Sequence, residues 1–150
     1  MKLGLLRKNI IINDTSAISI EQLKLFCNSL ESTIGLIIVD YIPLMSGEGL
    51  MKLTRQQEIE EIVSELKEFA VEQKISIIGV LPLSKYALKN VSPLWEMKQY
   101  GEVQAFADSI FFIQDLEKGI EGNYKIEFLK DRHSLTKSYL FKSCFAGFEE

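Results

Sequence analysis

Apolar residues recur along this chain with two different periods, which separates expected strands from expected helices. Residues 34–39 and 75–81 are apolar at almost every position. Such short uninterrupted runs are typical of strands that a parallel sheet buries on both faces. We therefore predict two central strands there. A third strand is predicted at residues 9–13, where three isoleucines lie between two asparagines.

Two helices are predicted, and each begins at a capping box. Ser19 with Gln22, and Thr54 with Gln57, have the three-residue spacing in which each side chain accepts a hydrogen bond from the other residue's backbone. Apolar residues then recur every three or four positions, which gives each helix one buried face. The predicted buried residues are Ile20, Leu23, Phe26, Cys27 and Leu30 in the first helix, and Ile59, Ile62, Val63, Leu66, Phe69 and Ala70 in the second.

The rest of the chain is predicted to be a loop at residues 85–93, a short helix from Pro93 to Tyr100, and strands at 107–114, 124–130 and 137–143, with a turn at 119–123. Strands that alternate with helices imply parallel pairing, and the closing strands imply antiparallel pairing. Residues 1–150 are thus expected to form a single α/β domain. Its sheet is partly parallel, flanked by helices, and ends in antiparallel edge strands.

Composition excludes several classes of protein. The 17 basic and 21 acidic residues give a net charge of −4, which argues against a generic basic coat for nucleic acid or a polybasic membrane surface. No apolar run approaches the roughly 20 residues that cross a bilayer, so no membrane association is expected. Cys27 and Cys144 lie far apart without a metal-binding pattern, which favours reduced, at least half-buried thiols in the cytoplasm.

Six aromatic residues near the closing strands are expected to be core residues, and no platform for stacking bases is invoked. They are Phe106, Phe111, Phe112, Phe128, Tyr139 and Phe141.

Asp40 is the first candidate for chemistry because it directly follows the apolar residues 36–39. Ligands of open α/β sheets bind beyond the carboxyl ends of the strands, where one carboxylate can hold a magnesium-bound water beside nucleotide phosphates. An acidic residue in this position also ends strands or caps the next helix without any catalytic role. The pattern alone favours that structural interpretation.

An ordered series of motifs resembles the C-terminal half of the motor domain of DnaB-type replicative helicases. The series consists of residues 40–45 (DYIPLM), 55–59 (RQQEI), 77–85 (IIGVLPLSK), 93–101 (PLWEMKQYG), 107–108 (AD) and 129–132 (LKDR). The similarity begins at about residue 9 and covers nearly the whole chain. It implies a RecA-like fold, incomplete relative to the full motor domain, in a ring that binds ATP between neighbouring subunits.

The resemblance also implies roles for individual residues. Asp40 would help to place magnesium. Lys130 and Arg132 would reach across to the γ-phosphate of ATP on the neighbouring subunit, with the arginine as a finger that neutralises transition-state charge. Residues two apart on a strand point to the same side, so both can face one phosphate group. We expect Asp40 and this pair to line one rim of a shared sheet. Without the family context, Lys130 and Arg132 would be an exposed basic pair on an edge strand.

Lys98, Gln99 and Gly101 match family positions that contact the backbone of DNA in the central channel, which makes single-stranded DNA a candidate partner. A lysine with backbone amides suits a phosphate contact that carries no sequence information. The alternative is a solvated helix end.

Departures from the family pattern limit the expected activity. Pro82 stands in place of the sensor glutamine, Pro43 replaces a second glutamine, and residues 104–106 lack two family carboxylates. No Gly-x-x-x-x-Gly-Lys-Ser/Thr motif occurs, and the 39 residues before Asp40 are too few to hold that phosphate-binding loop and its flanking elements. The catalytic glutamate that follows the loop is missing with it. We therefore expect a truncated domain that does not hydrolyse ATP alone.

Three interpretations follow. The chain is a helicase domain for ATP-dependent DNA unwinding, with ATP and Mg²⁺ as cofactors by resemblance. Alternatively, it is a non-catalytic module that docks on full-length helicase subunits, offers Lys130 and Arg132 in trans, and caps or tunes a ring. The third interpretation is a remnant of a truncated gene, whose incomplete sheet exposes apolar surface and favours self-association.

Overall fold

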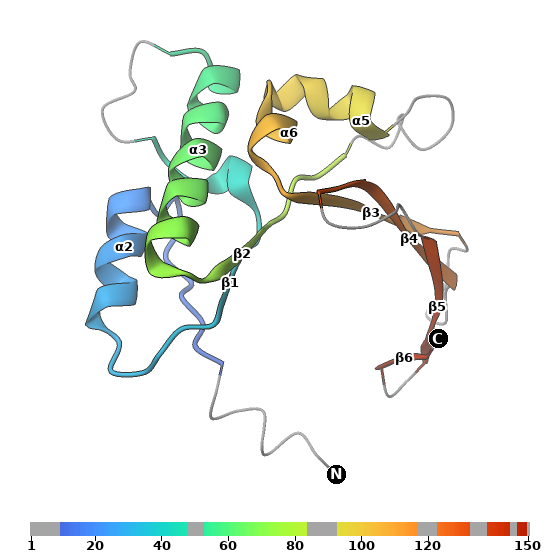
Figure 1. The fold of residues 1–150 in the computed structure, drawn as a ribbon, viewed down its shortest axis with the longest axis horizontal. Coiled ribbons are helices and arrows are strands. Elements are labelled where there is room, and N and C mark those ends of the chain that lie inside the picture. Colours follow the sequence, from blue (N-terminus) through green and yellow to red (C-terminus); the bar gives the residue numbers. More distant parts are fainter. Residues whose placement is uncertain are drawn as a thin grey trace.

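The computed structural model describes residues 10–47, 53–83, 93–116, 123–132, 138–144 and 147–149 (Figure 1). The elements are α2 (Ile20–Ser29), β1 (Leu36–Val39), the 3₁₀ helix η1 (Ile42–Leu44), α3 (Arg55–Gln73), β2 (Ser76–Gly79), α5 (Pro93–Glu96), the 3₁₀ helix η2 (Met97–Tyr100), α6 (Val103–Phe106), β3 (Ser109–Asp115), β4 (Asn123–Asp131), β5 (Ser138–Cys144) and β6 (Gly147–Glu149). The strand predicted at residues 9–13 is wrong, because residues 10–13 are exposed and form no strand. The predicted loop at 85–93 and turn at 119–123 lie almost wholly outside the described residues.

Both predicted capping boxes are confirmed. The Ser19 hydroxyl accepts a hydrogen bond from the Gln22 amide at 3.2 Å, and the Gln22 side chain accepts one from the Ser19 amide at 3.1 Å. Thr54 and Gln57 make the same exchange at the start of α3. The predicted faces are also confirmed. Six of their residues are buried, namely Ile20, Leu23, Ile59, Ile62, Leu66 and Phe69, and the other five are half-buried, namely Phe26, Cys27, Leu30, Val63 and Ala70.

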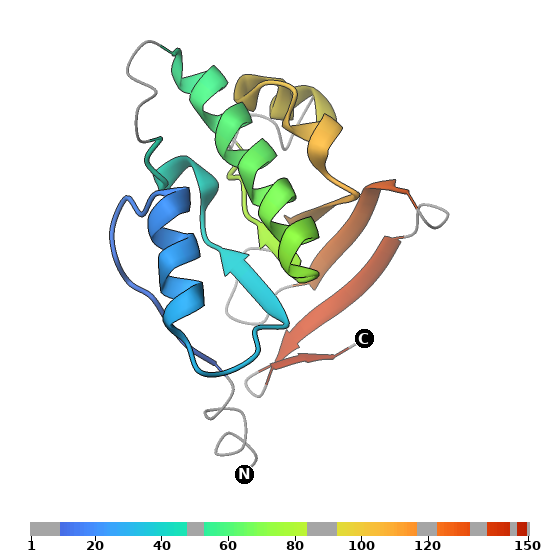
Figure 2. The ribbon, with the colours of Figure 1, turned by 60° about the vertical axis from the view of Figure 1, so that its left-hand side comes forward.

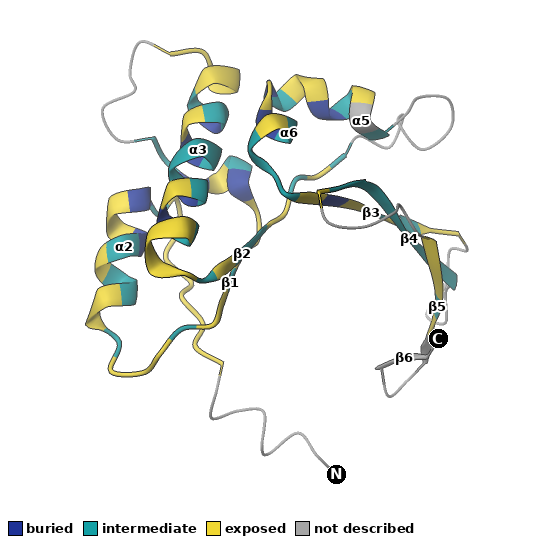
Figure 3. Cartoon of the chain, viewed as in Figure 1, coloured by how far each residue is buried: buried dark blue, intermediate teal, exposed yellow. Residues whose placement is uncertain are grey.

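β1 and β2 form a two-stranded parallel sheet in which Leu36 lies opposite Ser76 and Val39 lies opposite Gly79. Val39 and Ile77 pack against the core that α2 and α3 build on one face of this sheet. Exposed and half-buried positions alternate along β1 (Figure 3). The exposed ones, Leu36 and Ile38, are 48% and 61% exposed and lie on the face away from this core. The expected burial of β1 on both faces is therefore wrong, because only one face meets helices within the described residues.

The antiparallel part predicted for the end of the chain is confirmed as a sheet in the order β3-β4-β5-β6. Strand alternation gives this sheet two unlike faces. Phe111 lies opposite Phe128, and Ile126 lies opposite Tyr139, so these side chains share one face. The opposite face carries polar residues, among them an ion pair between Lys125 and Glu127 at 2.8 Å.

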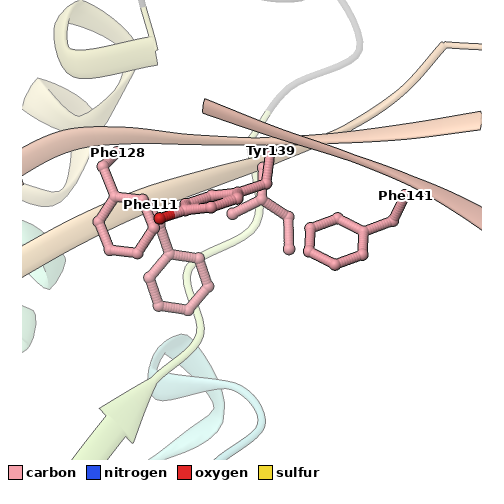
Figure 4. A pocket seen from close by; sticks show the side chains of 5 residues that line it. Phe111, Phe128, Tyr139 and Phe141 are labelled. Atoms are coloured by element: carbon pink, nitrogen blue, oxygen red, sulfur yellow. The ribbon is translucent and has the colours of Figure 1, made fainter. Parts of the chain in front are cut away.

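The apolar side of this sheet is open. We call Phe111, Ile126, Phe128, Tyr139 and Phe141 the aromatic face; they line a hollow of about 500 Å³ (Figure 4). Phe111 is 41% exposed and Tyr139 is 38% exposed. None of the six aromatic residues expected in the core is fully buried. That prediction is wrong: Phe111 and Tyr139 are exposed, and the other four are half-buried. On the aromatic face the reason is that no described element packs over it, whereas Phe106 lies in α6 and Phe112 lies on the opposite face of the sheet.

One core nevertheless joins the two sheets. Ile110 of β3 and Val103 of α6 belong to the same buried cluster as Ile42 and Ile62, and Leu129 of β4 packs against it. The α/β class with parallel and antiparallel parts is thus confirmed, but the parts are two sheets and not one. No helix in the described ranges has the length and apolar character needed to span a membrane.

Candidate phosphate-contacting and DNA-contacting sites

Asp40 lies directly after β1, at the carboxyl edge of the parallel sheet, and it is exposed. The Val80 amide donates to the Val39 carbonyl, and the Ile42 amide donates to the Val80 carbonyl, both at 3.0 Å. These bonds fix the backbone on both sides of Asp40, and the Asp40–Tyr41 peptide bond is cis. Where the structure describes the chain, no three His, Cys, Asp or Glu side chains gather around a common metal position. Since Mg²⁺ is often held by one or two carboxylates together with phosphates, Asp40 fits a partial magnesium contact and not a complete site.

Lys130 and Arg132 point to the same side of the end of β4, as their spacing predicts. Lys130 Nζ donates to the Gln104 carbonyl at 2.7 Å. Arg132 Nη1 donates to Asp108 Oδ1 at 2.8 Å, and Nη2 donates to the Ala105 carbonyl at 3.1 Å. Both basic side chains therefore contact α6 and the residues that follow it in the same chain.

These contacts leave N–H donors of the Lys130 and Arg132 side chains available for a phosphate group. A guanidinium group carries five N–H donors and an ammonium group carries three. The side chain of Arg132 uses two donors in the two hydrogen bonds above, Lys130 uses one, and the Arg132 side chain is 47% exposed. The pair can thus donate to a phosphate group while α6 still holds it.

Asp108 holds two cations at once. Its Oδ1 accepts from Arg132, and its Oδ2 forms an ion pair with Lys67 of α3. Sequence reasoning gave no role to Asp108 or Lys67. The sequence held a weak indication that Lys67 makes a contact within the chain, because it directly follows the buried Leu66 and lies on the half-buried side of α3.

The predicted DNA-contacting residues form the turn around η2. Lys98 and Gln99 are exposed, whereas Gly101 is buried with a φ of 80°. The Gly101 amide donates to the Lys98 carbonyl at 3.0 Å. A Cβ at this position would overlap the side chain of Glu60, whose carboxylate accepts from the Glu102 amide at 2.6 Å. Gly101 therefore shapes the turn with its own amide engaged, and Lys98 and Gln99 are the accessible side chains.

Pro82 takes part in the same region through its backbone. The Tyr100 hydroxyl donates to the Pro82 carbonyl, which links the exit of β2 to the turn. Burial raises the pKa of Tyr100, and the negative charge of Glu96 adds to this effect. The phenol therefore stays protonated and keeps donating across the neutral pH range.

Asp40 and the basic pair lie on separate parts of the molecule. Arg55, at the start of α3, donates to the Pro43 carbonyl near Asp40. Lys67, which contacts Asp108, lies twelve residues later, or about 18 Å along the helix axis. Figure 2 shows the cyan arrow of β1 and the orange antiparallel strands on different sides of the green α3. The expectation of one shared rim is therefore wrong.

Two solved structures share the fold of this chain. A DnaB-like replicative helicase, whose structure was reported with its interactions with primase, superposes with a TM-score of 0.80 at 17% sequence identity and covers 95% of this chain and 38% of its own. A second solved structure, described as an ATPase domain, superposes with a TM-score of 0.69 at 16% identity, over 83% of this chain and 48% of its own. The fold is that of RecA-like helicase ATPase domains.

Sequence comparison identifies the family within this class. The family model described as "DnaB-like helicase C terminal domain" matches residues 3–149. The replicative DNA helicase DnaC of Bacillus subtilis is 33% identical over 115 residues, which is 73% of this chain and 25% of that protein. The replicative DNA helicase DnaB of Helicobacter pylori (strain 26695) is 34% identical over 114 residues, which is 71% of this chain and 23% of that protein. The chain belongs to the DnaB-like helicase C-terminal domain family and spans about a quarter of the length of these relatives.

Proposed function

We propose that this chain acts in ATP-dependent DNA unwinding in the cytoplasm as the arginine-finger side of a DnaB-type motor. In this role it presents Lys130 and Arg132 to ATP held by another subunit, and it does not hydrolyse ATP alone. The observation that carries the proposal is the position of this pair. Both side chains lie together at the end of β4, on a different part of the molecule from Asp40.

The separation of the two sites supports an action between subunits. Asp40 follows β1 of the parallel sheet, whereas Arg132 follows β4 of the separate antiparallel sheet. Arg55, which contacts the Pro43 carbonyl near Asp40, and Lys67, which pairs with Asp108, are twelve residues apart on α3, or about 18 Å along its axis. A nucleotide between two subunits can meet the Asp40 surface of one and the basic pair of the other. An arginine placed there stabilises the charge that develops during phosphoryl transfer.

ATP and Mg²⁺ are the proposed cofactors of the assembled motor. Bound Mg-ATP supplies the phosphoryl group whose transfer releases the free energy for unwinding. Asp40 would contact the magnesium or its bound water, and Lys130 and Arg132 would contact the γ-phosphate. The 150 residues contain no phosphate-binding loop, whose backbone amides and lysine provide most of the grip on nucleotide. The partner must therefore be a helicase subunit that carries such a loop.

Single-stranded DNA is the second proposed partner. Lys98 and Gln99 expose their side chains beside a turn that Gly101 and Glu60 hold in shape. A contact of this kind is electrostatic and independent of base sequence, so it should weaken as salt is raised. Because the whole chain carries a net charge of −4, the attraction is local to this turn.

Mixed rings test the proposal. The chain would be added to full-length DnaC of Bacillus subtilis, with co-sedimentation to verify assembly and steady-state ATPase as the readout. We expect mixtures with the unchanged chain to retain ATPase, and mixtures with Arg132→Ala to lose about 10³-fold at the affected interfaces. Lys125→Ala, which removes a cation on the polar face of the sheet, is the matched control. Equal ATPase with both variants, or failure of the chain to co-sediment, would contradict the proposal.

A non-catalytic module that caps or tunes a ring is the second candidate function. The exposed aromatic face favours it, because an apolar face of this kind suits protein contact. The mixed rings separate the two candidates. A module that caps the ring through this face, without offering Lys130 and Arg132, lowers ring ATPase to the same extent with Arg132→Ala as with the unchanged chain.

A further inference from the structure

We propose that Asp108 is the positioning residue of Arg132, and that Lys67 anchors it to α3. This inference rests on the proposed function, because it explains how the chain presents its arginine to a phosphate group on another subunit.

Arg132 is held at three points around Asp108. Nη1 donates to Asp108 Oδ1 at 2.8 Å, Nη2 donates to the Ala105 carbonyl at 3.1 Å, and the Arg132 amide donates to the Asp108 carbonyl at 3.0 Å. The two side-chain bonds attach both terminal nitrogens of the guanidinium group, which restricts rotation along the side chain. A group held in its working orientation before the phosphate arrives loses less freedom when it binds.

Lys67 gives this arrangement a rigid base. Its ammonium group pairs with Asp108 Oδ2, so the carboxylate is tied to the middle of a 19-residue helix. The residues on either side of Asp108 are also fixed, because Ala107 packs against the core and Ile110 is part of it. Asp108 thus connects the long side chain of Arg132 to α3 and, through its neighbours in the chain, to the core.

The charges around Asp108 indicate that its carboxylate positions Arg132 without neutralising the positive charge of the group. A single carboxylate paired with one arginine would form a neutral pair. Here Lys67 and Arg132 share one carboxylate, so the three groups keep a net positive charge, and Lys130 adds another beside them. Asp108 therefore holds the guanidinium group without cancelling the charge of both cations that it contacts.

The test is a double-mutant cycle in the mixed rings described above. Asp108→Asn keeps the size of the side chain and removes its charge. We expect kcat at saturating ATP to fall by roughly 10- to 100-fold, with little change in KM, because the arginine is misplaced in the transition state. In the Arg132→Ala background, Asp108→Asn should have no further effect on kcat. Glu127→Gln, which breaks the Lys125 ion pair on the same strand, is the control and should leave kcat unchanged.

A second measurement needs no partner. In the full chain labelled with ¹⁵N-arginine, the terminal N–H groups of Arg132 should rotate slowly, and Asp108→Asn should make this rotation fast while Glu127→Gln does not. Unchanged rotation in Asp108→Asn would overturn the positioning role.

The outcomes separate this inference from the proposed function. If Arg132→Ala leaves the ATPase of mixed rings unchanged, the proposed function fails, whatever Asp108 does. If Arg132→Ala abolishes activity but Asp108→Asn behaves like Glu127→Gln, only the positioning role is overturned. A further loss from Asp108→Asn in the Arg132→Ala background also overturns it, since Asp108 would then act by another route.

Discussion

The helical part and the antiparallel sheet of this chain differ in how they bury their apolar side chains. In the helical part, Ile62 and Phe69 of α3 are each only 2% exposed. In the sheet, Phe111 and Ile113 are 41% and 56% exposed although the strands are as apolar on one face as any core strand. The apolar side chains of the helical part are buried against one another. The aromatic face is also made of apolar side chains, but no described residues pack over it.

The candidate site residues divide between the same two parts. Asp40 follows β1 in the helical part, whereas Lys130 lies near the end of β4 in the antiparallel sheet and Arg132 directly follows that strand. The parts meet where Lys67 pairs with Asp108. Asp40 and the basic pair thus lie on two different surfaces of the chain, as the proposed action between subunits requires.

The largest expected difference between the two parts is in stability. Ile62→Ala removes a fully buried side chain and should lower the free energy of unfolding by about 2–5 kcal/mol. Ile113→Ala, in an exposed position of the sheet, should cost less than about 1 kcal/mol. Urea unfolding measures both. Equal losses would show that the sheet is as well packed as the helical part.

The second prediction concerns association through the aromatic face. Ile113 lies opposite Ile126 and so shares this face, whereas Leu140 lies opposite Lys125 on the polar face. Both are exposed, at 56% and 64%. Ile113→Lys should weaken self-association or helicase binding at least about tenfold, which is roughly 1.4 kcal/mol. Leu140→Lys should have little effect. Sedimentation velocity gives the affinities. Equal weakening by Ile113→Lys and Leu140→Lys would show that association does not depend on the aromatic face.

The third prediction compares the two helix caps. Ser19 is fully buried and Thr54 is exposed, although both form the same capping box. Ser19→Ala should cost about 1–2 kcal/mol of unfolding free energy and Thr54→Ala about 0.5–1 kcal/mol. Thermal or urea unfolding distinguishes them. A larger loss of unfolding free energy for Thr54→Ala than for Ser19→Ala would contradict the expectation that the buried cap contributes more.

The smallest effect is a pH dependence at the start of α3. A hydrogen bond from Arg55 lowers the pKa of Glu58; burial opposes this, and the Gly47 amide and the charge of Arg55 add to the lowering. A carboxyl group whose pKa is lowered on folding stabilises the protein above its unfolded pKa of about 4.3 and loses this effect as the pH falls through the folded value. Glu58→Gln should thus cost roughly 0.5 kcal/mol at pH 7, and the difference from the unchanged chain should shrink below about pH 4. Glu61→Gln, on the exposed side of the same helix, is the control for urea unfolding at both pH values.

The sequence predicted the features that depend on neighbouring residues. The capping boxes, the buried faces of α2 and α3, and the common side of Lys130 and Arg132 all follow from spacings of two to four residues. The exposure of Leu36, Ile38 and the aromatic face did not follow, because alternation shows which residues are apolar but not what covers them. The Lys67–Asp108 ion pair was also missed, because its residues are 41 positions apart and no local pattern connects them.

The most direct test of the account is photo-crosslinking with an ATP analogue that carries a photoreactive group on its γ-phosphate. Crosslinked peptides of this chain would be mapped with Mg²⁺, in the presence and absence of full-length DnaC of Bacillus subtilis. We predict labelling around Lys130 and Arg132 only when the helicase is present, because the proposed function places the nucleotide on the other subunit. Equal labelling of the chain alone, or labelling confined to the surroundings of Asp40, would contradict the proposal that the basic pair acts on ATP bound by another subunit.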